Sequence, residues 1–174
     1  MLLIISAISD EETRNKIELI YEEYASAMYF KANSILKNKQ DAEDAVQLSF
    51  EKIIKNADKI ETPIGNKTRS FVLIVVENTA IDLYRKRKNL SESPLDILEQ
   101  TSFKHVEYAG SNELVKQILK LSPKYRNIMI LKYVHGYNYS EIGQIMGMSE
   151  EASKKAGQRA KEKLEIMCKE HGIL

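Results

Sequence analysis

The feature that most constrains the fold is an apolar residue at every third or fourth position over long stretches of the chain. Such stripes run through residues 10–37, 41–56 and 68–88. Spacings of three and four place side chains on one face of an α-helix. Only 7 glycines and 3 prolines interrupt the 174 residues, which disfavours a turn-rich β fold. The sequence therefore predicts an all-α protein.

Capping and breaking residues set the predicted boundaries in the first half of the chain. A long helix is predicted over residues 10–37, ended by Asn38–Gln40, and a second begins with Asp41 as its N-cap. The segment 57–67 contains proline, glycine and asparagine and is predicted to be a loop before a helix over residues 68–88. The predicted buried faces are Ile17, Ile20, Tyr24, Ala27, Met28 and Ile35; Val46, Phe50, Ile53, Ile54 and Ala57; and Phe71, Ile74, Val75, Asn78 and Ile81.

The second half of the chain is also predicted to be helical. After a short helix over residues 113–120, Ser122-Pro123 supplies a cap and a proline at the first position of a helix that ends at Gly136. Ser140 is predicted to cap a further short helix and Ser149 a last, longer one. We find no internal repeat.

Residues 89–112 are the predicted linker between the two halves. They contain serines, a proline and four acidic residues against one lysine, although Leu95–Leu98 could form a helical turn. We therefore expect two small helical domains, residues 10–88 and 113–170, joined by a flexible acidic linker.

Composition limits the compartment in which the chain can work. A single cysteine excludes an intramolecular disulfide framework and fits a reducing environment. No segment approaches the roughly 20 apolar residues that span a bilayer. The apolar first eight residues have no basic residue ahead of them and no cleavage pattern. We expect a cytoplasmic protein without membrane insertion.

The net charge of +1 conceals an uneven distribution along the chain. Residues 1–83 have a balance of −4, residues 84–88 of +4, residues 89–121 of −2 and residues 122–174 of +3. A near-neutral total therefore does not exclude a nucleic-acid binder, because two local basic surfaces are cancelled by acidic segments.

The first basic surface is the run Arg85–Lys88 at the end of the third predicted helix. Its cations could neutralise DNA phosphates and release counterions, or they could simply complement the C-terminal helix dipole. Asn78, Asp82 and Arg85 follow at steps of four and three, which places an amide, a carboxylate and a guanidinium in a row on one face.

The second basic surface belongs to a predicted helix-turn-helix over residues 139–163. A capped short helix, a turn containing glycine and a second capped helix make this layout, although a plain αα-corner with a lysine-rich surface fits the same pattern. Alanines at positions 152, 156 and 160 would let the last helix pack closely. Its predicted exposed, DNA-binding residues are Lys154, Lys155, Gln158, Arg159 and Lys161.

Residue patterns of catalysis are absent from the sequence. It contains no glycine-rich phosphate loop, nucleophile elbow or zinc-protease motif. Cys168 and His171 are spaced as zinc ligands could be, yet a zinc site needs three or four converging ligands. We expect no enzyme activity, no cofactor and no metal.

A third polar face is formed by Asp44, Gln47 and Glu51. Taken by itself, its spacing is typical of the solvated side of an amphipathic helix.

Taken together, three motifs resemble the extracytoplasmic-function (ECF) sigma factors of the sigma-70 family, which are bacterial RNA polymerase subunits. The first is Asp41-Ala-Glu-Asp-Ala-Val-Gln47-Leu-Ser-Phe50, and the second is Asn78-Thr-Ala-Ile-Asp82-Leu-Tyr-Arg85-Lys-Arg87. The third joins Leu121-Ser-Pro-Lys-Tyr-Arg126 to the helix-turn-helix. They follow the family's order and spacing.

The resemblance implies a role for each set of residues. Asp41, Asp44, Gln47 and Glu51 would bind a coiled coil of core RNA polymerase. The loop 57–67, with Asn66 and Lys67, would take up a base flipped from the −10 promoter element. The −10 DNA would also meet Asn78, Asp82, Arg85, Lys86, Arg87 and Lys88. The acidic linker would occupy the polymerase's RNA path. The implied partners are core polymerase, promoter DNA and an anti-sigma factor.

The chain departs from the family pattern mainly in the recognition helix. Ser153 stands where the family usually has a buried valine, and Ala156 stands where it usually has an arginine that faces DNA. Gly157 lies within the helix, where glycine costs roughly 1 kcal/mol relative to alanine. Phe71 replaces a usual tryptophan. These changes leave the reading of a −35 element open. Two alternatives therefore remain: a helix-turn-helix regulator that acts without polymerase, and a helical protein that sequesters polymerase or another partner.

Overall fold

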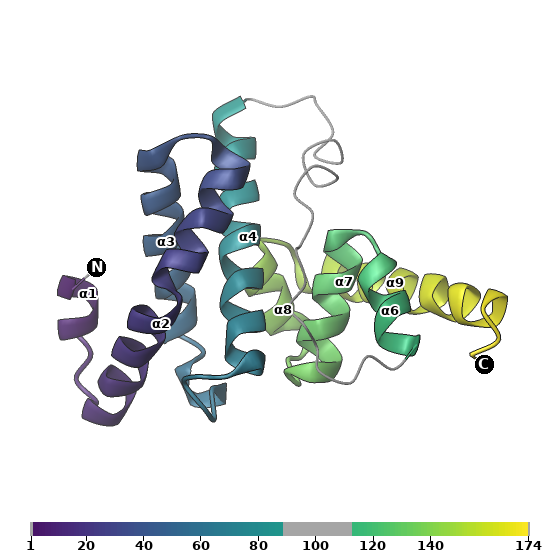
Figure 1. The fold of residues 1–174 in the computed structure, drawn as a ribbon, viewed down its shortest axis with the longest axis horizontal. Helices are drawn as coiled ribbons and strands as arrows, with labels where there is room; N and C mark the ends of the chain where they lie inside the picture. Colours follow the sequence, from purple (N-terminus) through teal and green to yellow (C-terminus); the bar gives the residue numbers. More distant parts are fainter. Residues whose placement is uncertain (1, 89–112, 174) are drawn as a thin grey trace. The chain divides into compact units, whose positions relative to one another are not determined.

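The computed structural model describes residues 2–88 and 113–173. The chain divides into two compact units, residues 1–103 and 104–174, and the described residues of each are helices and turns (Figure 1). The all-α expectation is therefore confirmed. The predicted linker, including the helical turn at Leu95–Leu98, lies outside the described residues.

The first unit is built around three long helices that contact one another pairwise. They are α2 (Glu11–Leu36), α3 (Lys39–Ile54) and α4 (Asn66–Lys88), and Figure 1 shows them side by side. A short α1 (Leu2–Ser6) packs against α2, and a 3-10 turn, η1 (Ala57–Lys59), follows α3. Their shared core contains Ile17, Ile20, Tyr24, Met28, Phe50, Ile53, Phe71 and Val75, which follow the predicted apolar stripes.

Two predicted boundaries in this unit are wrong by a few residues. Asn38, not Asp41, caps α3: its side chain accepts a hydrogen bond from the Asp41 backbone N–H at 3.1 Å. Asn38 has the extended backbone that an N-cap requires, so Asp41 becomes part of the first turn. The helix α4 begins at Asn66, so Asn66 and Lys67 are helical instead of part of the preceding loop.

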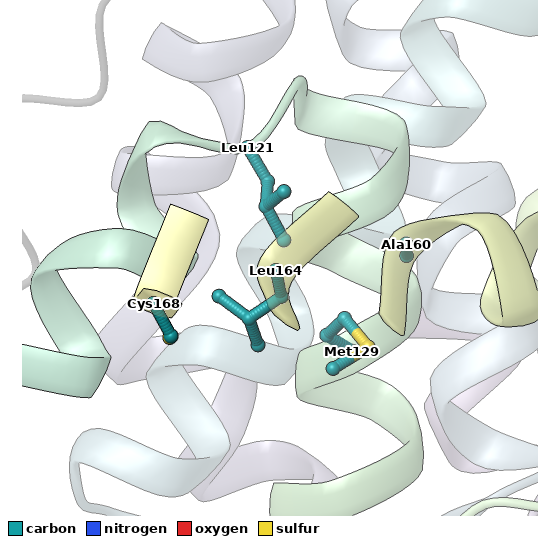
Figure 2. Close-up of a cluster of buried hydrophobic side chains, with 5 residues drawn as sticks. All are labelled: Leu121, Met129, Ala160, Leu164 and Cys168. Carbon is teal, nitrogen blue, oxygen red and sulfur yellow. The ribbon is translucent and has the colours of Figure 1, made fainter. Parts of the chain in front are cut away.

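The second unit contains α6 (Glu113–Lys120), α7 (Pro123–Met129), α8 (Tyr139–Met146) and α9 (Glu150–Glu170). A π-helical segment, η2 (Ile130–Val134), continues α7 up to the predicted stop at Gly136. The helix α9 packs against α6, α7 and α8. Figure 2 shows part of its core, where Leu121, Met129, Ala160, Leu164 and Cys168 meet.

The predicted helix-turn-helix is confirmed as α8, a turn at Gly147 and α9. Ser149 caps α9 as predicted, accepting from the Ala152 backbone N–H at 3.1 Å. The prediction for α8 is wrong, because Asn138 forms a capping box with Glu141 and displaces Ser140 from the cap. Ala152 is exposed in the first turn, so it is not part of the packed alanine face.

Candidate nucleic-acid and protein interfaces

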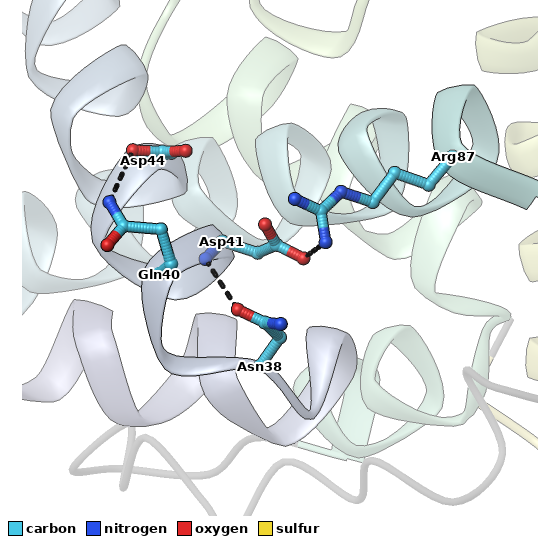
Figure 3. Close-up of polar contacts among 5 residues, drawn as sticks. All are labelled: Asn38, Gln40, Asp41, Asp44 and Arg87. Atoms are coloured by element: carbon cyan, nitrogen blue, oxygen red, sulfur yellow. Dashed lines mark hydrogen bonds and ion pairs between the residues drawn. The ribbon is translucent and has the colours of Figure 1, made fainter.

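Asp44, Gln47 and Glu51 form one exposed face of α3. The Gln40 amide donates a hydrogen bond to Asp44 Oδ1 at 3.4 Å (Figure 3). Asp41 differs from the other predicted polymerase contacts, because it is only 3% exposed and its carboxylate is ion-paired with the Arg87 guanidinium from the end of α4. Asp41 therefore offers almost no surface of its own.

Beside this face, α2 and α3 enclose a hollow of about 470 Å³. Its lining includes Tyr21, Tyr29, Phe30, Glu43, Val46 and Gln47. Phe30 is 70% exposed, which is unusual for so large an apolar side chain. The sequence analysis missed these aromatics. The steps of four that link Tyr21 to Tyr29 through Ala25 are the signal that could have found them, because they define a second stripe on α2.

The row Asn78, Asp82 and Arg85 on α4 is only partly exposed. Asn78 is 8% exposed, and its amide donates to the Ile74 carbonyl at 2.7 Å, so it belongs to the inner stripe. The Asp82 carboxylate and the Arg85 guanidinium lie 3.7 Å apart, with their side chains 28% and 49% exposed. Lys86 is exposed next to them.

A lysine that the sequence did not single out lies under this row. Lys52 of α3 donates a hydrogen bond to the Thr79 hydroxyl at 3.2 Å. Burial raises the pKa of the Asp82 carboxyl, and the nearby Lys52, Arg85 and Lys86 cations oppose that rise. Burial also lowers the pKa of Lys52, against the attraction of Asp82. The two groups therefore form a partly buried, charged cluster that joins α3 to α4.

At the other end of α4, Asn66 and Lys67 are both exposed. The Lys67 ammonium lies 4.0 Å from the Glu61 carboxylate, and both side chains are largely solvated. An ion pair of this kind contributes little and leaves Lys67 available to another anion.

All five predicted DNA-binding residues of α9 are exposed, but several have acidic neighbours. Lys155 pairs with Glu151 at 2.6 Å, Lys161 lies 3.9 Å from Glu165, and Gln158 donates to Glu162 at 3.3 Å. These contacts reduce the positive potential of the helix. The structure brings Lys154, Lys155, Gln158, Arg159 and Lys161 to the exposed surface of one helix.

Two of the unusual residues of the recognition helix, Ser153 and Gly157, share one neighbour, Tyr139. The Ser153 hydroxyl is 2.5 Å from the Tyr139 carbonyl, to which it donates, and a Cβ added at Gly157 would lie 2.6 Å from the Tyr139 ring. The Lys132 ammonium lies 5.0 Å from the centre of that ring. Burial, with a smaller effect of Tyr133, raises the pKa of the Tyr139 hydroxyl. Ala156 is 6% exposed, so its position is turned toward the protein.

Residues 2–88 and 113–173 contain no cluster of three or more His, Cys, Asp or Glu side chains suited to a metal ion. Cys168 is fully buried in the apolar cluster of Figure 2. None of the helices in the described ranges is long and apolar enough to cross a membrane.

The fold defines a class: a helical protein with a helix-turn-helix unit, a layout typical of DNA-binding proteins, and a helical bundle whose last helix ends in a basic run. Comparison with known families makes this specific. The model of sigma-70 region 2 matches residues 20–90, and the model of sigma-70 region 4 matches residues 111–164.

Curated relatives from Bacillus subtilis agree with both matches. The chain is 27% identical over 156 residues to the ECF RNA polymerase sigma factor SigM, covering 87% of this chain and 94% of the relative. It is 29% identical over 119 residues to the RNA polymerase sigma factor SigV, covering 68% and 70%. It is 27% identical over 144 residues to the ECF sigma factor SigW, covering 74% and 76%.

The chain therefore belongs to the sigma-70 family, as an ECF sigma factor with regions 2 and 4. It is a non-enzymatic protein that serves transcription initiation and binds core RNA polymerase and promoter DNA.

Proposed function

We propose that residues 10–88 bind core polymerase and open the −10 element, that residues 89–112 connect the two domains, and that residues 113–170 bind the −35 element. The observation that carries this proposal is the placement of exposed basic residues on two separate helices, the end of α4 and the surface of α9. Two separate sites on one chain can recognise the −10 and −35 elements at the same time, with polymerase holding the two domains at the required spacing.

Core polymerase would meet the face of α3 that carries Asp44, Gln47 and Glu51. The adjacent hollow supports this choice, because an exposed aromatic such as Phe30 can receive an apolar anchor within a charged rim. Asp41 would act by positioning: its ion pair with Arg87 ties the start of α3 to the end of α4.

The −10 DNA would lie along α4. The helix has 23 residues, so at about 1.5 Å per residue its ends lie about 35 Å apart, or about ten nucleotides of a stacked strand at about 3.4 Å each. Arg85, Lys86, Arg87 and Lys88 would bind phosphates at one end, and Asn66 and Lys67 would lie near the captured base at the other. Asn78 and Asp82 would support the helix surface between them.

The −35 DNA would contact Lys154, Lys155, Gln158, Arg159 and Lys161 of α9. Each phosphate contact contributes to affinity through counterion release. Because glutamates accompany two of these cations, Lys155 and Lys161, binding by this unit alone should be weak, and polymerase would supply the remaining affinity.

Reconstituted transcription with core polymerase and genomic fragments tests the proposal. We expect start sites that depend on the protein, and little gel shift of the same fragments when polymerase is absent. Strong binding without polymerase and no dependent start sites would support a direct regulator instead. Core binding without transcription would support a sequestering protein.

We also propose that the protein works in the cytoplasm and that an anti-sigma factor, a partner implied by the family resemblance, covers the face formed by Asp44, Gln47 and Glu51. An anti-sigma factor of this kind should compete with core polymerase for the chain. Simultaneous binding of both would contradict the proposed overlap.

A further inference from the structure

The segment between η1 and α4 is held by a buried tyrosine from a distant part of the sequence. Tyr24 of α2 is 4% exposed and lies 41 positions before Gly65. Its hydroxyl accepts a hydrogen bond from the Gly65 backbone N–H at 2.7 Å and donates one to the Gly65 carbonyl at 3.1 Å. One side-chain oxygen thus binds both backbone groups of a single loop residue.

The conformation of Gly65 makes this contact specific. Its φ is +154°, a backbone region that side-chain-bearing residues rarely adopt, while a Cβ at this position would meet nothing within 4 Å. Glycine is therefore required here by the backbone and not by lack of space. A second bond, from the Thr68 hydroxyl to the Thr62 carbonyl at 2.5 Å, closes the same segment against the start of α4.

Ile64 is the most exposed apolar side chain of the fixed segment, and Pro63 beside it is half-buried. Ile64 is 49% exposed, whereas Ile60 at the beginning of the same segment is 5% exposed and packs into the core. Residues 57–67 contain no aromatic side chain on which a base could stack. Extruded bases are held between aromatic or apolar side chains, so Ile64 is the residue of this segment suited to that contact.

We propose that Tyr24 is a positioning residue that fixes residues 61–65, and that Ile64, held in this way, is the apolar contact for a base extruded from the −10 element. The inference rests on the proposed function of residues 10–88 and adds the residue that touches the base and the residue that places it.

Two substitutions separate the two roles. Tyr24→Phe keeps the buried ring and removes both bonds to Gly65, so the segment is released while the core stays packed. Ile64→Ser removes the apolar contact and leaves the bonds to Gly65 in place. The matched controls are Leu19→Ser, which alters another exposed aliphatic residue of the first unit, and Tyr125→Phe, which removes a hydroxyl from the second unit.

The assay uses holoenzyme assembled from core polymerase and the full chain, on a promoter fragment selected by the transcription experiment above. Each position of the −10 element carries 2-aminopurine in turn, and its fluorescence reports extrusion of that base. We expect Tyr24→Phe and Ile64→Ser each to slow promoter opening about tenfold, with affinity for core and for the closed promoter within twofold of the unaltered protein. Both controls should open the promoter at the original rate.

An abasic site at the captured position supplies the readout that a merely structural role would not change. If Ile64 touches the base, Ile64→Ser should slow opening on the intact promoter and have no further effect on the abasic one. An equal loss on both templates, or opening at the original rate by both variants, would overturn the inference. If the unaltered protein opens no promoter at all, the proposed function fails first.

Discussion

The ion pair between Asp41 and Arg87 has unequal partners, and replacing each should have unequal effects. The Asp41 side chain is 4% exposed, whereas that of Arg87 is 58% exposed. Arg87→Gln leaves a buried carboxylate without its cation, which costs about 1–3 kcal/mol. The N-terminal turn of α3 offsets roughly 0.3–1 kcal/mol of that cost, since Asp41 lies in it. We expect a net loss of about 1–2 kcal/mol.

Asp41→Asn should cost less than about 1 kcal/mol, because the guanidinium that remains is largely hydrated and the lost attraction is screened by solvent. The double variant should resemble Asp41→Asn alone. Arg85→Gln is the matched control: its partner Asp82 is more exposed and 3.7 Å away, so the change should stay within about 0.5 kcal/mol.

Urea unfolding followed by far-UV circular dichroism gives these free energies, and hydrogen exchange of the α3 and α4 amides assigns them to the first unit. Equal losses for Arg87→Gln and Asp41→Asn would refute the reasoning, because they would mean that burial of the carboxylate does not decide the cost.

Three further predictions concern the two DNA-facing helices. Gly157→Ala should lower the free energy of unfolding in urea by about 1–2 kcal/mol, because the added methyl group overpacks against Tyr139. In a Tyr139→Ala background the same change should raise the free energy of unfolding by about 1 kcal/mol, and a rise in the original background would contradict the packing. The raised pKa of Asp82 means that the fold binds its proton more tightly than the unfolded chain does, so stability should fall as pH rises above about 3.9. Asp82→Asn should abolish this contribution, so the pH–stability curves of the variant and the unaltered protein should differ by it. Identical curves would exclude the contribution. In holoenzyme binding to promoter DNA, Arg85→Gln should reduce the salt slope by about 0.7–0.9, the lower value applying to a single strand. Arg87→Gln should reduce the slope less, because Asp41 already pairs with that cation, and equal slopes for the two variants would contradict this order.

The sequence predicted the helices well because their apolar spacing and stop signals are local. Boundaries were less certain where several polar residues compete: Asn38 and Asp41 are both good caps, and only the backbone angles at Asn38 decide between them. The N-cap of α8 is Asn138 and not the predicted Ser140, because the capping box that Asn138 forms with Glu141 satisfies two backbone groups at once.

Contacts between distant residues could not be predicted from spacing. The pairs Asp41 with Arg87 and Tyr24 with Gly65 join positions more than 40 residues apart, and both depend on how the three long helices pack. The same holds for Gly157. The sequence predicts only that glycine destabilises the helix at this position, whereas the structure places the Tyr139 ring where a side chain would lie.

The affinity of the chain for core RNA polymerase tests the central claim most directly. Asp44→Lys with Glu51→Lys reverses two charges on the exposed face of α3, and Glu23→Lys with Asp58→Lys makes the same change in charge at exposed positions outside α3. Reversing the charge on one of two complementary surfaces places like charges opposite each other and weakens binding. A tenfold loss of affinity corresponds to about 1.4 kcal/mol. We expect the first pair to lower the affinity for core at least about tenfold and the second pair to leave it unchanged. Equal affinity for both double variants and the unaltered chain would contradict the assignment of this face to polymerase.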